Sequence, residues 1–146
     1  MSADEKLEWL TDADRQELDA RRQWVYNHPG FFGAADTVEG KLDLIAHVLK
    51  AGHIAEGSRR YAAQCLGVVL GDAVAQARGM SWFMVSSAAG RAPCLGIAGS
   101  GIRIVTVTII DDELTAGRPV DIHHMFDYFC TSVDRLKAET MRAGSA

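Results

Sequence analysis

The sequence predicts an α+β fold in which N-terminal helices pack on a small antiparallel β-meander and a C-terminal helix closes the structure. Apolar residues recur at helical spacing up to about residue 78 and again after Asp121. Between them, β-forming runs separated by glycine turns fill residues 81–107. The length of 146 residues is typical of one domain, so we expect a single domain over 1–146.

The first helix is predicted over about 12–26. Thr11 and Asp14 have the spacing of a capping box, which satisfies backbone N–H groups at a helix start. The run Asn27-His28-Pro29-Gly30 ends this helix, because proline disfavours helix in the residue before it. The next residues, Phe31-Phe32, form a hydrophobic loop that must find cover.

Two more helices should follow, so that the N-terminal helices occupy about 12–52 before a third begins. Asp36 and Glu39 have the spacing of a second capping box at the start of the next helix, and Gly52 is expected to end that helix. Ser58 is placed to cap the third helix, expected over about 59–78.

Gly67 and Gly71 lie four residues apart on one face of that third helix. Each glycine costs about 1 kcal/mol relative to alanine in a helix interior. We expect that the glycines are there to allow the close approach of a neighbouring element. A ligand lying along the smooth face is the alternative, and we favour packing.

Three adjacent short strands are expected after the third helix. They cover residues 81–85, 93–98 and 102–107, with turns at 87–90 and 99–101. Tight turns between short β-forming runs are typical of an antiparallel meander.

The segment 108–116 can extend the last strand or form a helix, and its acidic residues followed by Gly117 favour a short helix. Asp121 should cap a final helix that packs on the sheet. We expect the tail at 140–146 to fray. The apolar positions of the final helix repeat at helical spacing: Ile122, Met125, Phe126, Phe129, Val133 and Leu136.

Charge and composition disfavour several classes of function. The chain has a net charge of −4 and no basic cluster, which is unlike a nucleic-acid binder. The pairs Arg21–Arg22 and Arg59–Arg60 are interpreted as solvated helix faces. Its apolar runs are too short to span a bilayer and its N-terminus lacks a secretory signal. We therefore expect a cytoplasmic protein with no membrane partner.

No residue pattern predicts a metal, cofactor or nucleophile. Adjacent helical residues point about 100° apart, so His123 and His124 cannot share a metal ion, although His123 can contact Asp127. Cys65, Cys94 and Cys130 lie in apolar surroundings, which favours buried thiols over a Cys–His pair. The glycines at 96–101 precede a strand, which indicates a turn and disfavours a phosphate loop.

An ordered set of short motifs resembles a bacterial family, domain of unknown function 3806. The motifs are Leu66-Gly67-Val68-Val69-Leu70-Gly71-Asp72, Gly79-Met80-Ser81-Trp82, Gly90-Arg91 and Gly117-Arg118-Pro119-Val120-Asp121. The resemblance covers roughly 60–135. It departs at 106–111, where members often carry a proline and a basic residue. The resemblance implies a small α+β module and assigns no activity.

Two classes of function remain open, and we favour the first. Small size, acidic balance and the lack of a catalytic spacing favour a non-catalytic protein-binding module. An immunity or antitoxin-like protein that covers a partner's cationic site is one specific form of this hypothesis. The partner is another protein, or a second copy that meets the Phe31-Phe32 loop or an uncovered sheet face. The alternative is a small enzyme with a pocket around Asp72, Trp82, Arg91 and Asp121.

Overall fold

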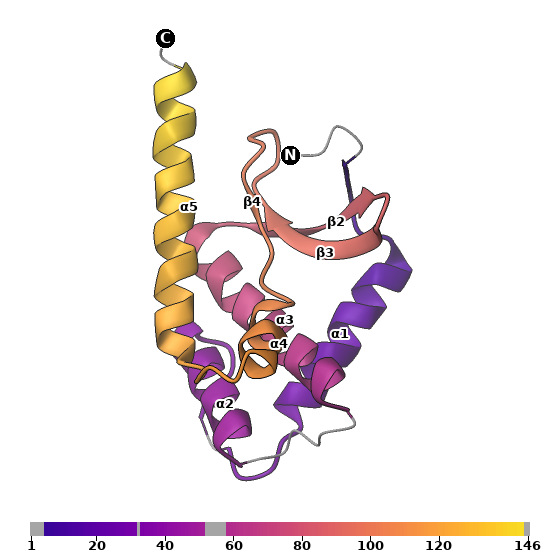
Figure 1. The fold of residues 1–146 in the computed structure, drawn as a ribbon, viewed down its shortest axis with the longest axis vertical. Coiled ribbons are helices and arrows are strands. Elements are labelled where there is room, and N and C mark those ends of the chain that lie inside the picture. Colours follow the sequence, from indigo (N-terminus) through magenta and orange to yellow (C-terminus); the bar gives the residue numbers. More distant parts are fainter. Residues whose placement is uncertain (1–4, 32, 52–57, 145–146) are drawn as a thin grey trace.

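The computed structural model describes residues 5–31, 33–51 and 58–144. Within these ranges the chain forms five helices and one antiparallel sheet of strand order β1-β2-β3-β4, which confirms the α+β class (Figure 1). In chain order the elements are β1 (Lys6–Glu8), α1 (Asp12–Tyr26), α2 (Val38–Ala51), α3 (Arg59–Arg78), β2 (Ser81–Ser87), β3 (Gly90–Gly96), β4 (Arg103–Ile104), α4 (Ile109–Thr115) and α5 (Ile122–Gly144).

Helix α3 is the centre of the fold, and it packs against α1, α2, α4 and α5 (Figure 1). Its residues are apolar on nearly every side, which is typical of a helix covered all round. Leu66, Val69 and Leu70 are completely buried in the core that these helices share. Tyr61 lies outside that core at 43% exposure, contrary to the inward direction that the helical spacing suggested.

Side-chain caps start three of the helices. The capping box is confirmed at α1, where the Asp14 amide donates to Thr11 Oγ1 at 3.1 Å and the Thr11 amide donates to Asp14 Oδ2 at 2.9 Å. Asp121 caps α5 by accepting from the His124 amide at 3.1 Å. Helix α2 corrects the sequence interpretation, because its cap is the Thr37 hydroxyl, which accepts from the Gly40 amide at 2.9 Å.

The remaining helix boundaries agree with the sequence prediction in most places. Ser58 precedes α3, but its side chain makes no capping bond to the helix. Gly79 ends α3 in the left-handed conformation, with a φ of 66°. The predicted stop at Gly52 lies outside the described residues, as does Phe32. Phe31 is half-buried and packs against the core.

The glycine face of α3 is confirmed as a packing surface. A Cβ at Gly67 would lie 2.5 Å from the Val107 carbonyl oxygen, and one at Gly71 would lie 2.6 Å from the Trp82 ring. Thr106 is fully buried between them and donates its hydroxyl hydrogen to the Gly67 carbonyl at 3.0 Å. The two glycines therefore let the chain after β4 cross directly over α3.

The sheet contains the predicted meander, with different bounds for each strand and one additional strand. Strands β2 and β3, of seven residues each, pair as a hairpin from Ser81↔Gly96 to Ser87↔Gly90. They were predicted over 81–85 and 93–98, so both extend further toward the turn, which is confined to residues 88–89, and β3 ends earlier than expected. The predicted strand 102–107 is wrong in extent, because β4 ends at Ile104. The chain then leaves the sheet, and Thr106 donates a hydrogen bond to Gly67 of α3. Strand β1, which pairs with β2, was not predicted, since three residues with only one apolar side chain, Leu7, are too short to show a strand pattern.

The last two helices complete the core. Helix α4 confirms that the segment 108–116 is helical. Helix α5 packs chiefly on α3 and α2, so the expectation that it lies on the sheet is wrong (Figure 1). The buried side chains Ile122, Phe129 and Val133 of α5 belong to the same core cluster as those of α2 and α3. The helix also continues to Gly144, where the tail was expected to fray.

The close packing at Gly67 predicts the effect of a single methyl group. Gly67→Ala should lower the free energy of unfolding by about 1–3 kcal/mol, because the added Cβ meets backbone atoms that cannot move aside. Gln64→Ala, one turn earlier on the same helix, should change it by less than about 0.5 kcal/mol. Urea unfolding of both variants checks this, and equal stability of Gly67→Ala and the wild type would contradict the close approach.

Candidate functional site

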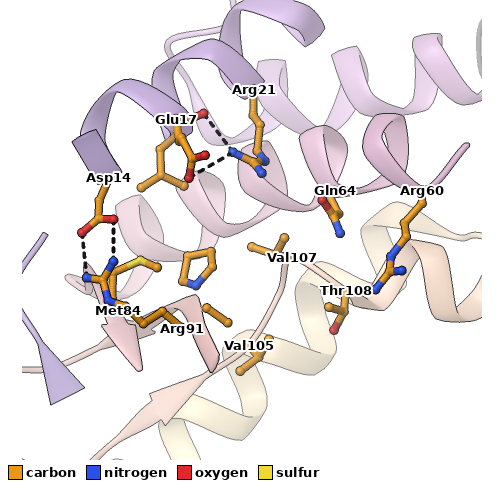
Figure 2. A pocket seen from close by; sticks show the side chains of 13 residues that line it. Asp14, Glu17, Arg21, Arg60, Gln64, Met84, Arg91, Val105, Val107 and Thr108 are labelled. Atoms are coloured by element: carbon orange, nitrogen blue, oxygen red, sulfur yellow. Dashed lines mark hydrogen bonds and ion pairs between the residues drawn. The ribbon is translucent and has the colours of Figure 1, made fainter. Parts of the chain in front are cut away.

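A cleft of about 330 Å³ lies between α1, α3, β3 and the chain that follows β4 (Figure 2). Charged and polar side chains from α1, α3 and Arg91 of β3 line its two ends, and apolar side chains line the floor between them. The lining residues are Asp14, Glu17, Leu18, Arg21, Arg60, Gln64, Met84, Arg91, Ala92, Pro93, Val105, Val107 and Thr108.

At one end of the cleft, Arg91 holds Asp14 in a two-pronged ion pair. The Arg91 guanidinium donates to the two Asp14 oxygens at 3.1 and 3.0 Å, and its Nε donates to Glu8 at 2.9 Å. The hydrogen bond from Arg91, helped by the Thr11 amide, holds the pKa of Asp14 well below its usual range. This carboxylate therefore stays ionised and is a poor general base.

At the other end, Arg21, Arg60 and Gln64 offer hydrogen-bond donors. Arg21 is partly engaged, because it donates to the Glu17 carbonyl at 3.2 Å and lies over the Tyr61 ring. Arg60 and Gln64 project from adjacent turns of α3 on the side that faces Thr108 (Figure 2). Arg60 makes no hydrogen bond or ion pair within the described ranges, so its guanidinium is available to a ligand.

The floor between these two ends is apolar. Leu18, Met84 and Val107 are buried there, and Val105 is exposed at 47% along the rim. The described residues that line the cleft include no histidine, cysteine or serine. The arrangement can bind a group that is partly apolar and partly anionic, and it presents no paired nucleophile and base.

Two of the four residues singled out in the sequence, Asp72 and Trp82, lie together in a separate network. The Trp82 indole N–H donates to Asp72 Oδ1 at 2.8 Å. Arg22 donates to both oxygens of the same carboxylate, from Nε to Oδ2 at 2.7 Å and from its terminal nitrogen to Oδ1 at 3.0 Å. Asp72 thus connects α1, α3 and β2, and each of its oxygens already accepts hydrogen bonds.

The other two residues lie elsewhere. Arg91 lines the cleft described above, whereas Asp121 caps α5 and lines two different depressions on the surface. Trp82 lines a further depression with Trp9 and Arg22. The structure therefore brings Asp72 and Trp82 together but does not gather all four residues in one cleft, because none of these clefts is lined by more than one of them.

A family model for a domain of unknown function (DUF3806) matches residues 41–126, which is more than half of the chain. The chain belongs to this family. The match begins within α2 and ends in the first turns of α5, so it starts and stops earlier than the resemblance read from the sequence motifs.

The fold also occurs in a crystal structure from Bacteroides thetaiotaomicron. The two chains share 17% identity with a TM-score of 0.71, over 87% of this chain and 47% of the other. This chain therefore spans about half the length of that protein, and the likeness concerns the fold alone. No curated protein matches the chain.

The DUF3806 motif residues are mainly structural in this chain. Gly67 and Gly71 make the close approach under Thr106, Asp72 and Trp82 bond to each other, and Arg91 anchors Asp14. The cleft residues Arg21, Arg60 and Gln64 were missed. Arg21 and Arg60 belong to the arginine pairs interpreted as solvated faces, and their partners Arg22 and Arg59 in fact bond to Asp72 and Thr115.

One group of side chains has the composition of a metal site. It comprises Glu39 and Asp43 of α2 and His123 of α5. His123 contacts these two carboxylates in place of the expected contact with Asp127.

The cysteine considered as a nucleophile in the sequence is Cys94. Burial raises the pKa of its thiol, which opposes a role as an activated nucleophile. Among the described residues, no helix is sufficiently long and apolar to cross a bilayer.

The Asp72 network predicts an asymmetric effect of two aspartates that contact the same arginine. Asp72→Ala should lower the free energy of unfolding by about 1–3 kcal/mol, because it leaves the part-buried Trp82 and Arg22 donors without an acceptor. Asp19→Ala should cost less than about 0.5 kcal/mol, since Asp19 is 68% exposed. Equal losses in denaturant unfolding would contradict this assignment.

The lowered pKa of Asp14 predicts a dependence of stability on acid. Stability from the Arg91 pair is complete above the ordinary aspartate pKa of about 4 and is lost as the pH falls toward the lower pKa of the folded state. Between about pH 5 and pH 2, Asp14→Asn should therefore lose less stability than the wild type. Asp12→Asn, with its side chain 98% exposed, should follow the wild type. Identical acid profiles of all three would exclude the pair as the cause.

Proposed function

We propose that the protein is a non-catalytic protein-binding module of bacterial type, and that the cleft between α1, α3 and β3 receives an acidic side chain of a partner protein together with an apolar neighbour. The observation that carries this proposal is Arg60, a cation without a partner in the described ranges, beside Arg21 and Gln64 over an apolar floor. A carboxylate bound there would gain charge-assisted hydrogen bonds.

The size of the cleft supports a side chain as the bound group. Small-molecule sites usually have volumes of about 300–1,000 Å³, and this cleft lies at the lower end with about 330 Å³. One or two side chains fill such a space, which is how an anchor residue of a protein partner binds. The surrounding apolar rim, including Val105, would then be covered by the rest of the partner.

The charge distribution favours this cleft over an acidic docking surface. An immunity-type protein would offer free carboxylates to a cationic partner. Here each acid between residues 5 and 19 contacts an arginine of the same chain. Each of these acids therefore already has an arginine partner, whereas Arg60 at the cationic end of the cleft has none in the described ranges.

Two further parts of the proposal concern the compartment and the enzyme alternative. Three buried cysteines without disulfide partners suit a reducing cytoplasm. The bacterial origin of the structural neighbour is in keeping with a bacterial module. An enzyme acting through Asp72, Trp82, Arg91 and Asp121 is the less favoured alternative, because Trp82, Arg91 and Asp121 line different clefts and both Asp72 oxygens already accept hydrogen bonds.

A peptide selection tests the proposal. A displayed library of random peptides, selected on the purified protein, should enrich sequences with Asp or Glu beside apolar residues. Arg60→Glu should weaken binding of an enriched peptide by about tenfold or more, because a hydrogen bond to a charged group is replaced by repulsion. Fluorescence anisotropy of the labelled peptide measures this change.

Arg135→Glu is the matched control, because Arg135 is also an exposed helical arginine without a partner in the described part of the chain. It should leave peptide affinity unchanged. The proposal is wrong if no acidic peptide is enriched, or if Arg60→Glu binds the enriched peptide as tightly as Arg135→Glu. Sedimentation showing a dimer that Arg60→Glu dissociates would replace the separate partner by a second copy.

A further inference from the structure

We propose that Glu39, Asp43 and His123 form a binding site for a divalent transition metal ion such as Zn²⁺, and that the ion joins α2 to α5. These residues lie outside the arginine-lined cleft, so the inference is independent of the proposed function. It rests on the geometry of the three side chains, the backbone that carries them, and the charges around them.

The three side chains converge from two helices. Glu39 and Asp43 are four residues apart and share one face of α2, while His123 lies in the first turn of α5. His123 Nε2 is 3.0 Å from Glu39 Oε1 and 3.9 Å from Asp43 Oδ1, and one ligand atom from each residue lies within 4.8 Å of the others. Zinc bonds of about 2.0–2.2 Å bring tetrahedral ligands to similar separations.

Side-chain caps fix the backbone on both sides of the cluster. The Thr37 hydroxyl holds the first turn of α2 through the Gly40 amide, next to Glu39. The Asp121 carboxylate holds the first turn of α5 through the His124 amide, next to His123. Helices α2 and α5 also pack on each other. The metal ligands are therefore presented by two anchored turns, and only the side chains must rotate.

The charges at this cluster are unbalanced. In the described ranges neither Glu39 nor Asp43 has an ion pair with lysine or arginine, unlike the acids of the N-terminal segment. Like charges four residues apart on a helix repel each other. A divalent cation between them removes that repulsion and adds a bond to the imidazole nitrogen.

The set of donor atoms selects the class of ion. One imidazole nitrogen and two carboxylate oxygens are ligands that Zn²⁺ accepts, whereas Ca²⁺ and Mg²⁺ favour oxygen alone. The three side chains are 48–69% exposed, so water can complete the coordination. The adjacent His124 faces a different depression, which Tyr128 and Glu113 also line, and it cannot join this cluster.

Titration of tag-free protein with zinc chloride in a calorimeter tests the site. The wild type should bind one ion per chain, and Zn²⁺ should raise its melting temperature, because the ligands come together only in the folded state. Even residues that merely orient a metal ligand are worth about 10–100-fold in affinity, so His123→Ala and Asp43→Asn should weaken binding by at least that factor.

The control is His124→Ala, which removes the neighbouring imidazole and should bind Zn²⁺ like the wild type. His123→Gln, with circular dichroism of every variant, separates loss of a ligand from loss of folding. Two results would overturn the inference. One is the absence of saturable binding of one ion to the wild type, and the other is unchanged affinity in folded His123→Ala or His123→Gln.

Discussion

The Asp72 carboxylate holds the molecule together at the point where three elements meet. It belongs to the central helix α3, accepts two hydrogen bonds from Arg22 of α1, and accepts another from the Trp82 indole of β2. On the same helix, Gly71 directly before Asp72 and Gly67 one turn earlier leave room for Thr106 to cross. The DUF3806 motif residues thus fix how α1, β2 and the segment after β4 pack on α3. The cleft is built from the same elements, so its shape depends on this packing.

The acidic N-terminal segment is part of the same construction. Glu8 and Asp14 reach Arg91 of β3, and Glu5 reaches Arg103 of β4 at 2.8 Å. These pairs attach β1 and the start of α1 to strands that are remote in the sequence. Exposed pairs of this kind each contribute little, but Asp14 is nearly buried and closes one end of the cleft. The acidic side chains of this segment are therefore paired with arginines of the same chain.

Local patterns predicted most of the fold, because helices and hairpins are specified by residues close in sequence. The Thr11 box, the Asp121 cap and the hairpin turn before Gly90 each act over a few positions. Long-range choices were not predictable in this way. Strand β1 exists only because β2 offers an edge, and β4 ends early because Thr106 has a buried partner on α3.

The candidate site shows the same limit. Arg91 was singled out, but its partner Asp14 lies 77 residues earlier and has the spacing of an ordinary helix cap. Arg60 carries no local signal that separates it from Arg59, since the direction of each side chain depends on where α4 and α1 pack. The contact of His123 with Glu39 and Asp43 of α2 was likewise not predictable, because these residues are remote in the sequence.

The lengths of the outer strands bear on how the molecule behaves at high concentration. The sheet ends on β1, three residues long, and on β4, two residues long. The seven-residue strands β2 and β3 lie between them. A long open edge is a template on which further chains can add strands and grow into aggregates. Strand β4 pairs only with Leu95 and Gly96, so the first five residues of β3 also form an edge, and Pro93 within it lacks the backbone N–H that an added strand would need. The short outer strands and this proline limit the backbone groups with which a second chain could pair.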